Sequence, residues 1–195
     1  MHKSKLSKYK SRPKKRNKQV TYEKSYIFWC KRCNVPLIGE ECCICKSSGK
    51  KINLSQPGDV RFCSPYEYEI LSQKLVSTYG CNPVKDKIIL LNKIPGEDKT
   101  DEVIIDGYQL GTLRFDLEIL DYQFDLSLDG AKILQNYTNK KTVTVKNIKR
   151  HLNGKKVHFD QIEDYTDDIK EGDHVLVKTS KFTGYGLSYF NSEDF

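Results

Sequence analysis

Four cysteines stand out in the stretch CKRCNVPLIGEECCIC, residues 30–45. They form two C-x-x-C pairs, Cys30 with Cys33 and Cys42 with Cys45, separated by eight residues. A C-x-x-C turn brings two thiolates together, and two such turns supply the four ligands of a tetrahedral Zn²⁺ at Zn–S distances of about 2.3 Å. The pattern predicts one structural zinc ion with no open position for catalysis. Cys43 is expected to be a spectator, or to replace Cys42 if the loop shifts by one residue.

The segments around the cysteines favour a zinc ribbon. Residues 26–29 and 51–54 are predicted strands, and Gly39 and Gly49 lie where the chain must turn. A segment of about 30 residues buries too little surface to fold alone, so the metal would supply much of the folding free energy. Disulfides or a redox dithiol are the alternatives. Outside the pattern, Cys63 and Cys81 are expected to be buried apolar residues, with a redox pair as the alternative.

The net charge of +7 comes from the N-terminus. Residues 1–20 carry nine basic side chains, Lys14, Lys15 and Arg16 among them, and no acidic one. Such a tail is expected to be disordered and to contact nucleic-acid phosphates, with a solubilising extension as the alternative. No run approaches 18 apolar residues, and no signal peptide is recognisable. We therefore expect a cytoplasmic protein without a membrane partner.

The middle of the chain alternates helices and strands, which predicts an α+β unit. Ser64-Pro-Tyr-Glu67 forms a capping box that starts a helix over 65–79, with Gly80 as its stop. Strands are expected at 88–91 and 119–128, a hairpin around Asp106-Gly107 joins 102–106 to 110–117, and a short helix covers 129–136. Five acidic residues are expected to be solvated rather than catalytic: Asp98, Asp101, Glu102, Asp106 and Asp116.

Short strands dominate the C-terminal part. They are predicted at 142–145, 155–159, 172–178 and 185–190, with one helical turn over 147–152. Several short strands and one small helix in about 55 residues favour a compact β-barrel-like module.

Two resemblances extend this prediction. The strand order, the Leu152-Asn-Gly154 turn and the string Ile169-Lys-Glu-Gly-Asp-His-Val-Leu-Val177 resemble the PUA domain, an RNA-binding pseudobarrel. The strings FWCKRCNVPL (28–37), PGDVR (57–61) and LLNKIPG (90–96) are similar to the N-terminal half of archaeal phosphoadenosine phosphosulfate reductase-like proteins. In that family a zinc ribbon, a pre-PUA segment and a PUA domain precede a nucleotide-activating catalytic domain.

The resemblance does not carry the reductase activity over to this chain. The sequence has no S-G-G-x-D-S-type pyrophosphate loop, and it ends where the catalytic half would begin. It also has Asp160-Gln-Ile162 where PUA domains commonly have a P-G-I-like turn. The lysines next to Gly154 remain well placed beside that turn.

The sequence therefore predicts a non-catalytic RNA-binding protein with an α+β fold. Its expected parts are a disordered basic tail (1–22), a zinc ribbon (23–62), an α+β pre-PUA unit (63–138) and a PUA-like β-barrel (139–195). The tail would attract phosphates together with four basic residues of the ribbon, Lys31, Arg32, Lys50 and Lys51. On the PUA-like part the candidate RNA-binding residues are Asn153, Gly154, Lys155, Lys156, Tyr185, Gly186, Ser188 and Tyr189.

Transfer RNA, ribosomal RNA and the ribosome are the expected partners. The main alternative is a recognition subunit for a separately encoded sulfur-transfer or nucleotide-activating enzyme. A protein-interaction adaptor, in which the ribbon docks a partner, is the third possibility.

Overall fold

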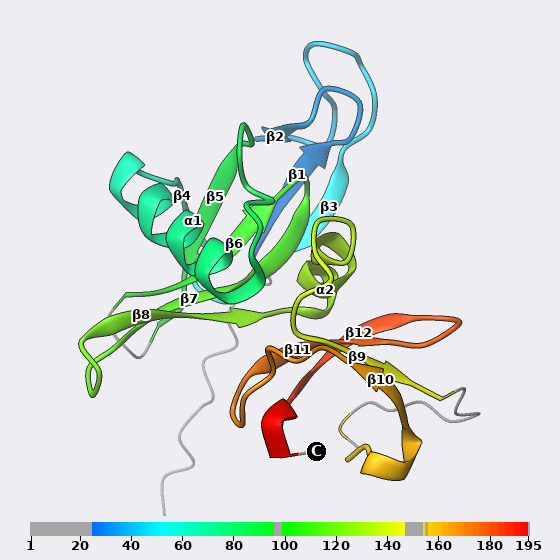
Figure 1. Cartoon of the computed structure of the whole chain (residues 1–195). Coiled ribbons are helices and arrows are strands. Elements are labelled where there is room, and N and C mark those ends of the chain that lie inside the picture. Colours follow the sequence, from blue (N-terminus) through cyan, green and yellow to red (C-terminus); the bar gives the residue numbers. More distant parts are fainter. Residues whose placement is uncertain (1–24, 96–98, 147–153, 155, 195) are drawn as a thin grey trace, which may run out of the picture.

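The structure is a computed structural model, and it describes residues 25–95, 99–146, 154 and 156–194 (Figure 1). The basic tail, including Lys14, Lys15 and Arg16, lies outside the described residues. Within these residues, three antiparallel or mixed sheets follow one another, in the orders β2-β1-β3, β4-β5-β6-β7-β8 and β10-β9-β11-β12.

The first two sheets and their helix form the larger part. Their elements are β1 (Tyr26–Cys30), β2 (Val35–Leu37), β3 (Lys50–Asn53), β4 (Asp59–Phe62), α1 (Pro65–Tyr79), β5 (Ile89–Lys93), β6 (Thr100–Ile105), β7 (Tyr108–Asp116) and β8 (Asp121–Leu126). The remaining elements are α2 (Leu128–Leu134), β9 (Thr142–Val145), β10 (Ile162–Tyr165), β11 (His174–Lys178) and β12 (Thr183–Leu187). Short 3-10 helices cover Phe159–Gln161 and Ser192–Asp194.

The five-stranded sheet is apolar on both faces, because successive strand residues point to opposite sides. On β5, Leu91 packs with the buried face of α1, whereas Leu90 packs with Trp29 of β1. On β6, Ile105 likewise packs with the buried face of α1, and Ile104 packs with Trp29. The sheet is therefore covered by α1 on one side and by the three-stranded β1–β3 sheet on the other (Figure 1).

Helix α1 has the predicted ends. The Ser64 hydroxyl accepts a hydrogen bond from the Glu67 amide, and the Glu67 carboxylate accepts one from the Ser64 amide. Gly80 ends the helix in the left-handed conformation, at φ 69°. The capping box and the glycine stop are both confirmed.

Beyond the cysteine region, strand β4 is an element that the sequence did not predict. Asp59–Phe62 pairs with β5 at the edge of the five-stranded sheet, although it lies within the segment assigned to the ribbon. The domain boundaries remain a prediction.

The C-terminal sheet differs from the expected barrel. Its strands β10 and β12 are its two edges, so the sheet is open within the described residues. The predicted strand at 155–159 is wrong over 156–159: residues 156–158 belong to no strand, Phe159 starts a 3-10 helix, and the strand that pairs with β9 begins at Ile162. The helical turn predicted at 147–152 lies outside the described residues.

The C-terminal sheet packs against the larger part through specific contacts. Leu176 of β11 is fully buried in the core beneath α1 and α2. The Tyr79 hydroxyl donates a hydrogen bond to the carbonyl of His174 at 3.4 Å, and His174 Nε2 lies 3.3 Å from Asp125. Helix α2 lies between β3 and β12 (Figure 1). Thr183 of β12 is hydrogen-bonded to Gln135 at the end of this helix.

Candidate metal centre and nucleic-acid interface

The four cysteines of the two C-x-x-C pairs come together. Their sulfur atoms all lie within 4.8 Å of one another, with Cys30 Sγ 3.4 Å from Cys45 Sγ and Cys33 Sγ 3.9 Å from Cys42 Sγ. Four sulfurs at about 2.3 Å from a tetrahedral metal are separated by about 3.8 Å. The cluster therefore fits a tetrahedral thiolate site, and these four side chains could hold a metal ion.

The two turns have matching backbones. Asn34 follows the second cysteine of the first pair at φ 55°, and Lys46 follows that of the second pair at φ 60°. A positive φ is uncommon for residues other than glycine, so two equivalent cases indicate that the turn geometry itself is required. In the first turn the Cys33 amide donates a hydrogen bond to Cys30 Sγ at 3.3 Å. Each turn thus aims its two sulfurs into the same space.

Cys45 and Cys33 differ in the pKa of their thiols. Hydrogen bonds from the side chain and backbone of Ser47 lower the pKa of Cys45 to about 6. Hydrogen bonding to Cys45 raises the pKa of Cys33 to about 12. Neighbouring thiolates repel one another unless a cation lies between them. A metal ion that displaces the remaining protons would remove this repulsion, because all four thiols bind a metal as thiolates.

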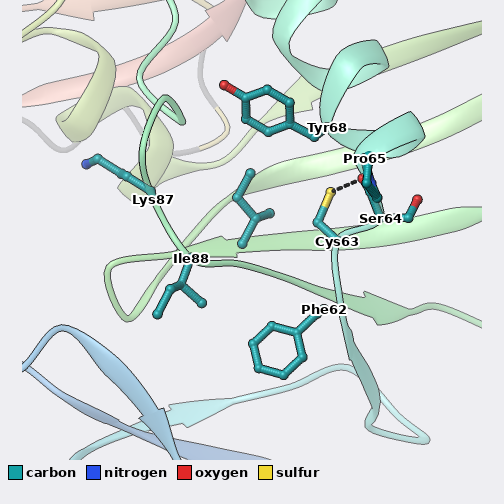
Figure 2. A pocket seen from close by; sticks show the side chains of 8 residues that line it. Phe62, Cys63, Ser64, Pro65, Tyr68, Lys87 and Ile88 are labelled. Atoms are coloured by element: carbon teal, nitrogen blue, oxygen red, sulfur yellow. Dashed lines mark hydrogen bonds between the residues drawn. The ribbon is translucent and has the colours of Figure 1, made fainter.

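The other cysteines are separate from this cluster. Every described cysteine is a free thiol, and Cys43 is exposed, so Cys42 is the sulfur that joins the group. Cys63 lines a hollow of about 330 Å³ with Phe62, Tyr68 and Lys87 (Figure 2), and burial raises its pKa to about 11. Burial also raises the pKa of Cys81. Both behave as half-buried apolar thiols rather than as reactive thiolates.

A hydrogen-bond chain fixes the first C-x-x-C turn to the five-stranded sheet. The buried Trp29 donates from Nε1 to Asn34 Oδ1 at 2.8 Å, and Asn34 Nδ2 donates to Asp106 at 2.8 Å. Asp106 also accepts from Lys87. Gly107, the other turn residue of the β6–β7 hairpin, lies directly against the Trp29 ring. The predicted Asp-Gly hairpin turn is confirmed, and it is also where the ribbon docks.

Two predicted solvated acids are instead buried. Asp101 and Glu102 are 8% and 6% exposed, because they lie on opposite faces of β6, inside the sheet rather than at a turn. Asp101 pairs with Arg61 at 3.1 Å. Glu102 accepts from Ser55, Asn92 and Gln109 and so ties the β3–β4 connection to the sheet. The expectation of solvation was wrong, and the role of both is structural.

The C-terminal candidates separate into exposed and structural residues. Lys156 Nζ lies 5.7 Å from the ring centroid of Tyr189, and the residue Tyr189 is 70% exposed. Tyr185 is also exposed and stacks on His174. In contrast, the buried Ser188 donates its hydroxyl hydrogen bond to the Phe190 carbonyl.

Four candidate RNA-binding residues remain: two glycines, and two residues that the structure does not describe. Gly154 is exposed at φ 66°, and Gly186 pairs with Val175 inside the sheet. Asn153 and Lys155 lie outside the described residues.

Exposed carboxylates follow one edge of the C-terminal sheet. They belong to β10 and to the segments on either side of it: Asp160, Glu163, Asp164, Asp167 and Glu171. Their charge would repel a phosphate backbone.

Comparisons with known proteins agree with the fold. No protein-family model matches the chain. MJ0066, an uncharacterised protein of Methanocaldococcus jannaschii, is 36% identical over 178 residues, which cover 88% of this chain and 37% of that protein. MJ0973, an uncharacterised protein of the same organism, is 34% identical over 131 residues, which cover 66% of this chain and 30% of that protein. The chain thus spans about a third of the length of the curated relatives it matches.

Two solved structures share the architecture. One is described as a conserved PUA domain protein from Thermoplasma acidophilum, with a TM-score of 0.52 and 18% identity over 70% of this chain and 83% of that one. The fold is PUA-like. The other is hypothetical protein PH0734.1 from Pyrococcus horikoshii, with a TM-score of 0.50 and 17% identity over 69% of this chain and 84% of that one. At these identities the likeness concerns the fold, and the relationship to reductase-like proteins stays a prediction.

None of the described helices is long and apolar enough to cross a membrane.

Proposed function

We propose that this protein binds RNA without catalysing a reaction, and that one Zn²⁺ held by Cys30, Cys33, Cys42 and Cys45 stabilises its ribbon. The PUA-like fold supports the first part, since the fold is shared with a protein described as a PUA domain protein. The fit of the sulfur cluster to tetrahedral coordination supports the second. Transfer RNA and ribosomal RNA are the proposed ligands.

The observation that carries the RNA proposal is the exposed pair formed by Lys156 and Tyr189. An aromatic residue that is 70% exposed can stack on an unpaired base, and a neighbouring ammonium can neutralise the adjacent phosphate. Single-stranded loops and bulges of structured RNA offer both groups together. The basic tail would add affinity that depends on salt but not on sequence.

A binding assay tests this proposal. Fluorescence anisotropy with a labelled transfer RNA should show weaker binding for the double variant Lys156→Glu, Tyr189→Ala than for the natural protein. Loss of one base stack alone costs about 1–3 kcal/mol, or roughly fivefold to more than a hundredfold in affinity. Lys170→Glu is the matched control, because Lys170 lies among the exposed carboxylates. Equal affinity of the double variant and the natural protein would refute the role of this pair.

The second candidate is a recognition subunit for a separately encoded, phosphoadenosine phosphosulfate reductase-like enzyme. The loop between β7 and β8 exposes three aliphatic side chains, Leu117, Ile119 and Leu120, of which Leu120 has a strained φ of 52°. Beside it lies a hollow of about 440 Å³ lined by Tyr66 and Phe115. Contiguous exposed apolar groups of this kind mark protein interfaces. Both curated relatives are also much longer than this chain, which leaves room in those proteins for a further domain.

Deletion of the gene distinguishes the two candidates. The subunit function predicts loss of a sulfur-containing RNA modification and co-purification with a catalytic partner. The double variant Leu117→Asp, Leu120→Asp should abolish that co-purification, whereas the Lys156 and Tyr189 variants should not. An unchanged modification profile would count against the subunit function.

A further inference from the structure

A second cluster of positive charge lies on the ribbon, away from Lys156 and Tyr189. It surrounds Tyr108, the first residue of β7. Lys50 Nζ lies 3.3 Å from the centre of the Tyr108 ring, and Lys31 Nζ lies 5.7 Å from it. We call these three residues, together with Asp129 and Lys132 of α2, the Tyr108 cluster. Their side chains come from the ribbon, the central sheet and α2.

The charges of the Tyr108 cluster are not balanced. Lys132 and Asp129 form an ion pair at 3.1 Å, which leaves Lys31 and Lys50 without a carboxylate within ion-pair distance in the described part of the chain. Partial burial is the main cause that lowers the pKa of Lys50. The charges of Tyr108 and Asp129 oppose this lowering, and those of Lys31 and Lys132 add to it. Lysines that repel one another in this way are stabilised when an anion binds between them.

The fold fixes the ammonium group of Lys50 and the backbone of Lys31. Lys50 donates a hydrogen bond to the Gly107 carbonyl at 2.7 Å, so its ammonium is held against the ring instead of extending freely into water. Lys31 is an exposed residue within the first C-x-x-C turn, next to Cys30. Its backbone is therefore held by the same turn that aims the cysteine sulfurs. A fixed cation loses less conformational entropy on binding than a free side chain does.

Helix α2 connects the Tyr108 cluster to the C-terminal sheet. Lys132 and Asp129 lie on this helix, and residue Gln135 at its end is hydrogen-bonded to Thr183 of β12. Figure 1 shows α2 between β3 above and β12 below. The Tyr108 cluster and the C-terminal sheet therefore adjoin the same helix, α2.

We propose that the Tyr108 cluster is a second RNA contact, at which Lys31 and Lys50 bind the phosphate backbone of an RNA already held by the C-terminal sheet. This inference rests on the proposed function. It identifies the ligand as an RNA long enough to cross α2, and it assigns to the ribbon a direct role in binding. The ring of Tyr108 lies beside both ammonium groups and in closest contact with that of Lys50.

The salt dependence of RNA binding tests the proposal. The logarithm of affinity falls linearly with the logarithm of salt concentration, by about 0.7–0.9 for each phosphate contact. In the full chain, with a labelled RNA hairpin that has single-stranded flanks, Lys31→Gln should reduce the slope by about 0.7–0.9 and Lys31→Gln with Lys50→Gln by about twice that. Lys170→Gln removes one exposed charge and should leave the slope unchanged.

The outcomes separate this inference from the function on which it rests. If the natural chain does not bind the hairpin, the proposed function fails. If it binds, and the Lys156 and Tyr189 variant weakens binding while both Tyr108-cluster variants keep the natural slope, the second contact is refuted and the function stands. The second contact is also refuted if Lys31→Gln and Lys170→Gln change the slope equally. Lys31→Gln alters only an exposed side chain, so a folding defect of the double variant leaves the test intact.

Discussion

Trp29 donates from Nε1 to Asn34 Oδ1 at 2.8 Å, and this hydrogen bond joins the buried face of the ribbon to the side chain that follows its first C-x-x-C pair. Asn34 occupies a left-handed conformation directly after Cys33, and its Nδ2 donates to Asp106 of the β6–β7 hairpin. One side chain therefore couples three features: the shape of the thiolate turn, the ribbon core and the docking of the ribbon. Trp29 is also the only tryptophan of the chain, so its fluorescence reports on all three.

Asn34→Ala should lower the free energy of unfolding by about 1–3 kcal/mol, because the buried indole N–H loses its acceptor. Urea unfolding followed by Trp29 fluorescence measures this change. Asn34→Gly is the control for the backbone, since glycine accepts the positive φ and lacks only the side chain. If Asn34→Gly were as stable as the natural protein, the side-chain bonds would contribute nothing and the coupling would be disproved.

Metal content tests the thiolate cluster. We expect one zinc ion per chain for the natural protein, measured by elemental analysis, and a loss of zinc in Cys30→Ser. Chelation should shift the Trp29 emission to longer wavelength, because the ribbon loses the ion that stabilises it. Cys43→Ser should keep its zinc, since that thiol is exposed and outside the cluster. Loss of zinc from Cys43→Ser instead would mean that the second pair binds in a different register.

Gly107→Ala should be strongly destabilising. Gly107 has φ 75°, and a methyl group there would lie 2.8 Å from Cγ of Trp29. The left-handed conformation costs about 1–2 kcal/mol, and overpacking against a buried ring adds about 1–3 kcal/mol. Gly39→Ala is the matched control, as nothing lies within 4 Å of its added methyl group. Thermal unfolding should give a lower Tm than that of the natural protein for Gly107→Ala but not for Gly39→Ala. Similar Tm values for the two variants would contradict the docking contact.

The stability of the C-terminal sheet should depend on pH through Asp125. The hydrogen bond and charge of His174 hold the pKa of Asp125 below its usual range. A carboxyl group whose pKa is lowered by folding stabilises the protein above its unfolded pKa of about 3.9, and this contribution is lost as the pH falls through the folded pKa. Asp125→Asn should therefore be less stable than the natural protein near neutral pH. The difference should shrink in acid, and a constant difference across the pH range would rule out the linkage.

Local signals predicted the larger part of the architecture. The Ser64–Glu67 capping box, the Gly80 stop and the Asp106-Gly107 turn each depend on neighbours within a few residues, and the structure has all three. The C-x-x-C pairs likewise encode their own turns, so the four sulfurs could be placed together from spacing alone.

Long-range relationships could not be predicted in this way. The burial of Asp101 and Glu102 depends on Arg61 and Ser55, which are 40 and 47 residues distant along the chain. The sequence predicted Lys31 and Lys50 as residues that attract phosphates. That both lie beside Tyr108 depends on packing between the ribbon and β7, which no short motif encodes. The interval 155–159 alternates like a strand, but β9 pairs with residues from Ile162 onward, and pairing decides where a strand lies.

Ultraviolet crosslinking of the protein to RNA, with the crosslinked peptides identified by mass spectrometry, tests the central claim most directly. The account predicts a nucleotide attached to the peptide that contains Tyr189, and retention of that crosslink in a variant lacking residues 1–20. Crosslinks confined to the basic tail, with none on the C-terminal sheet, would contradict it and leave only a nonspecific tether.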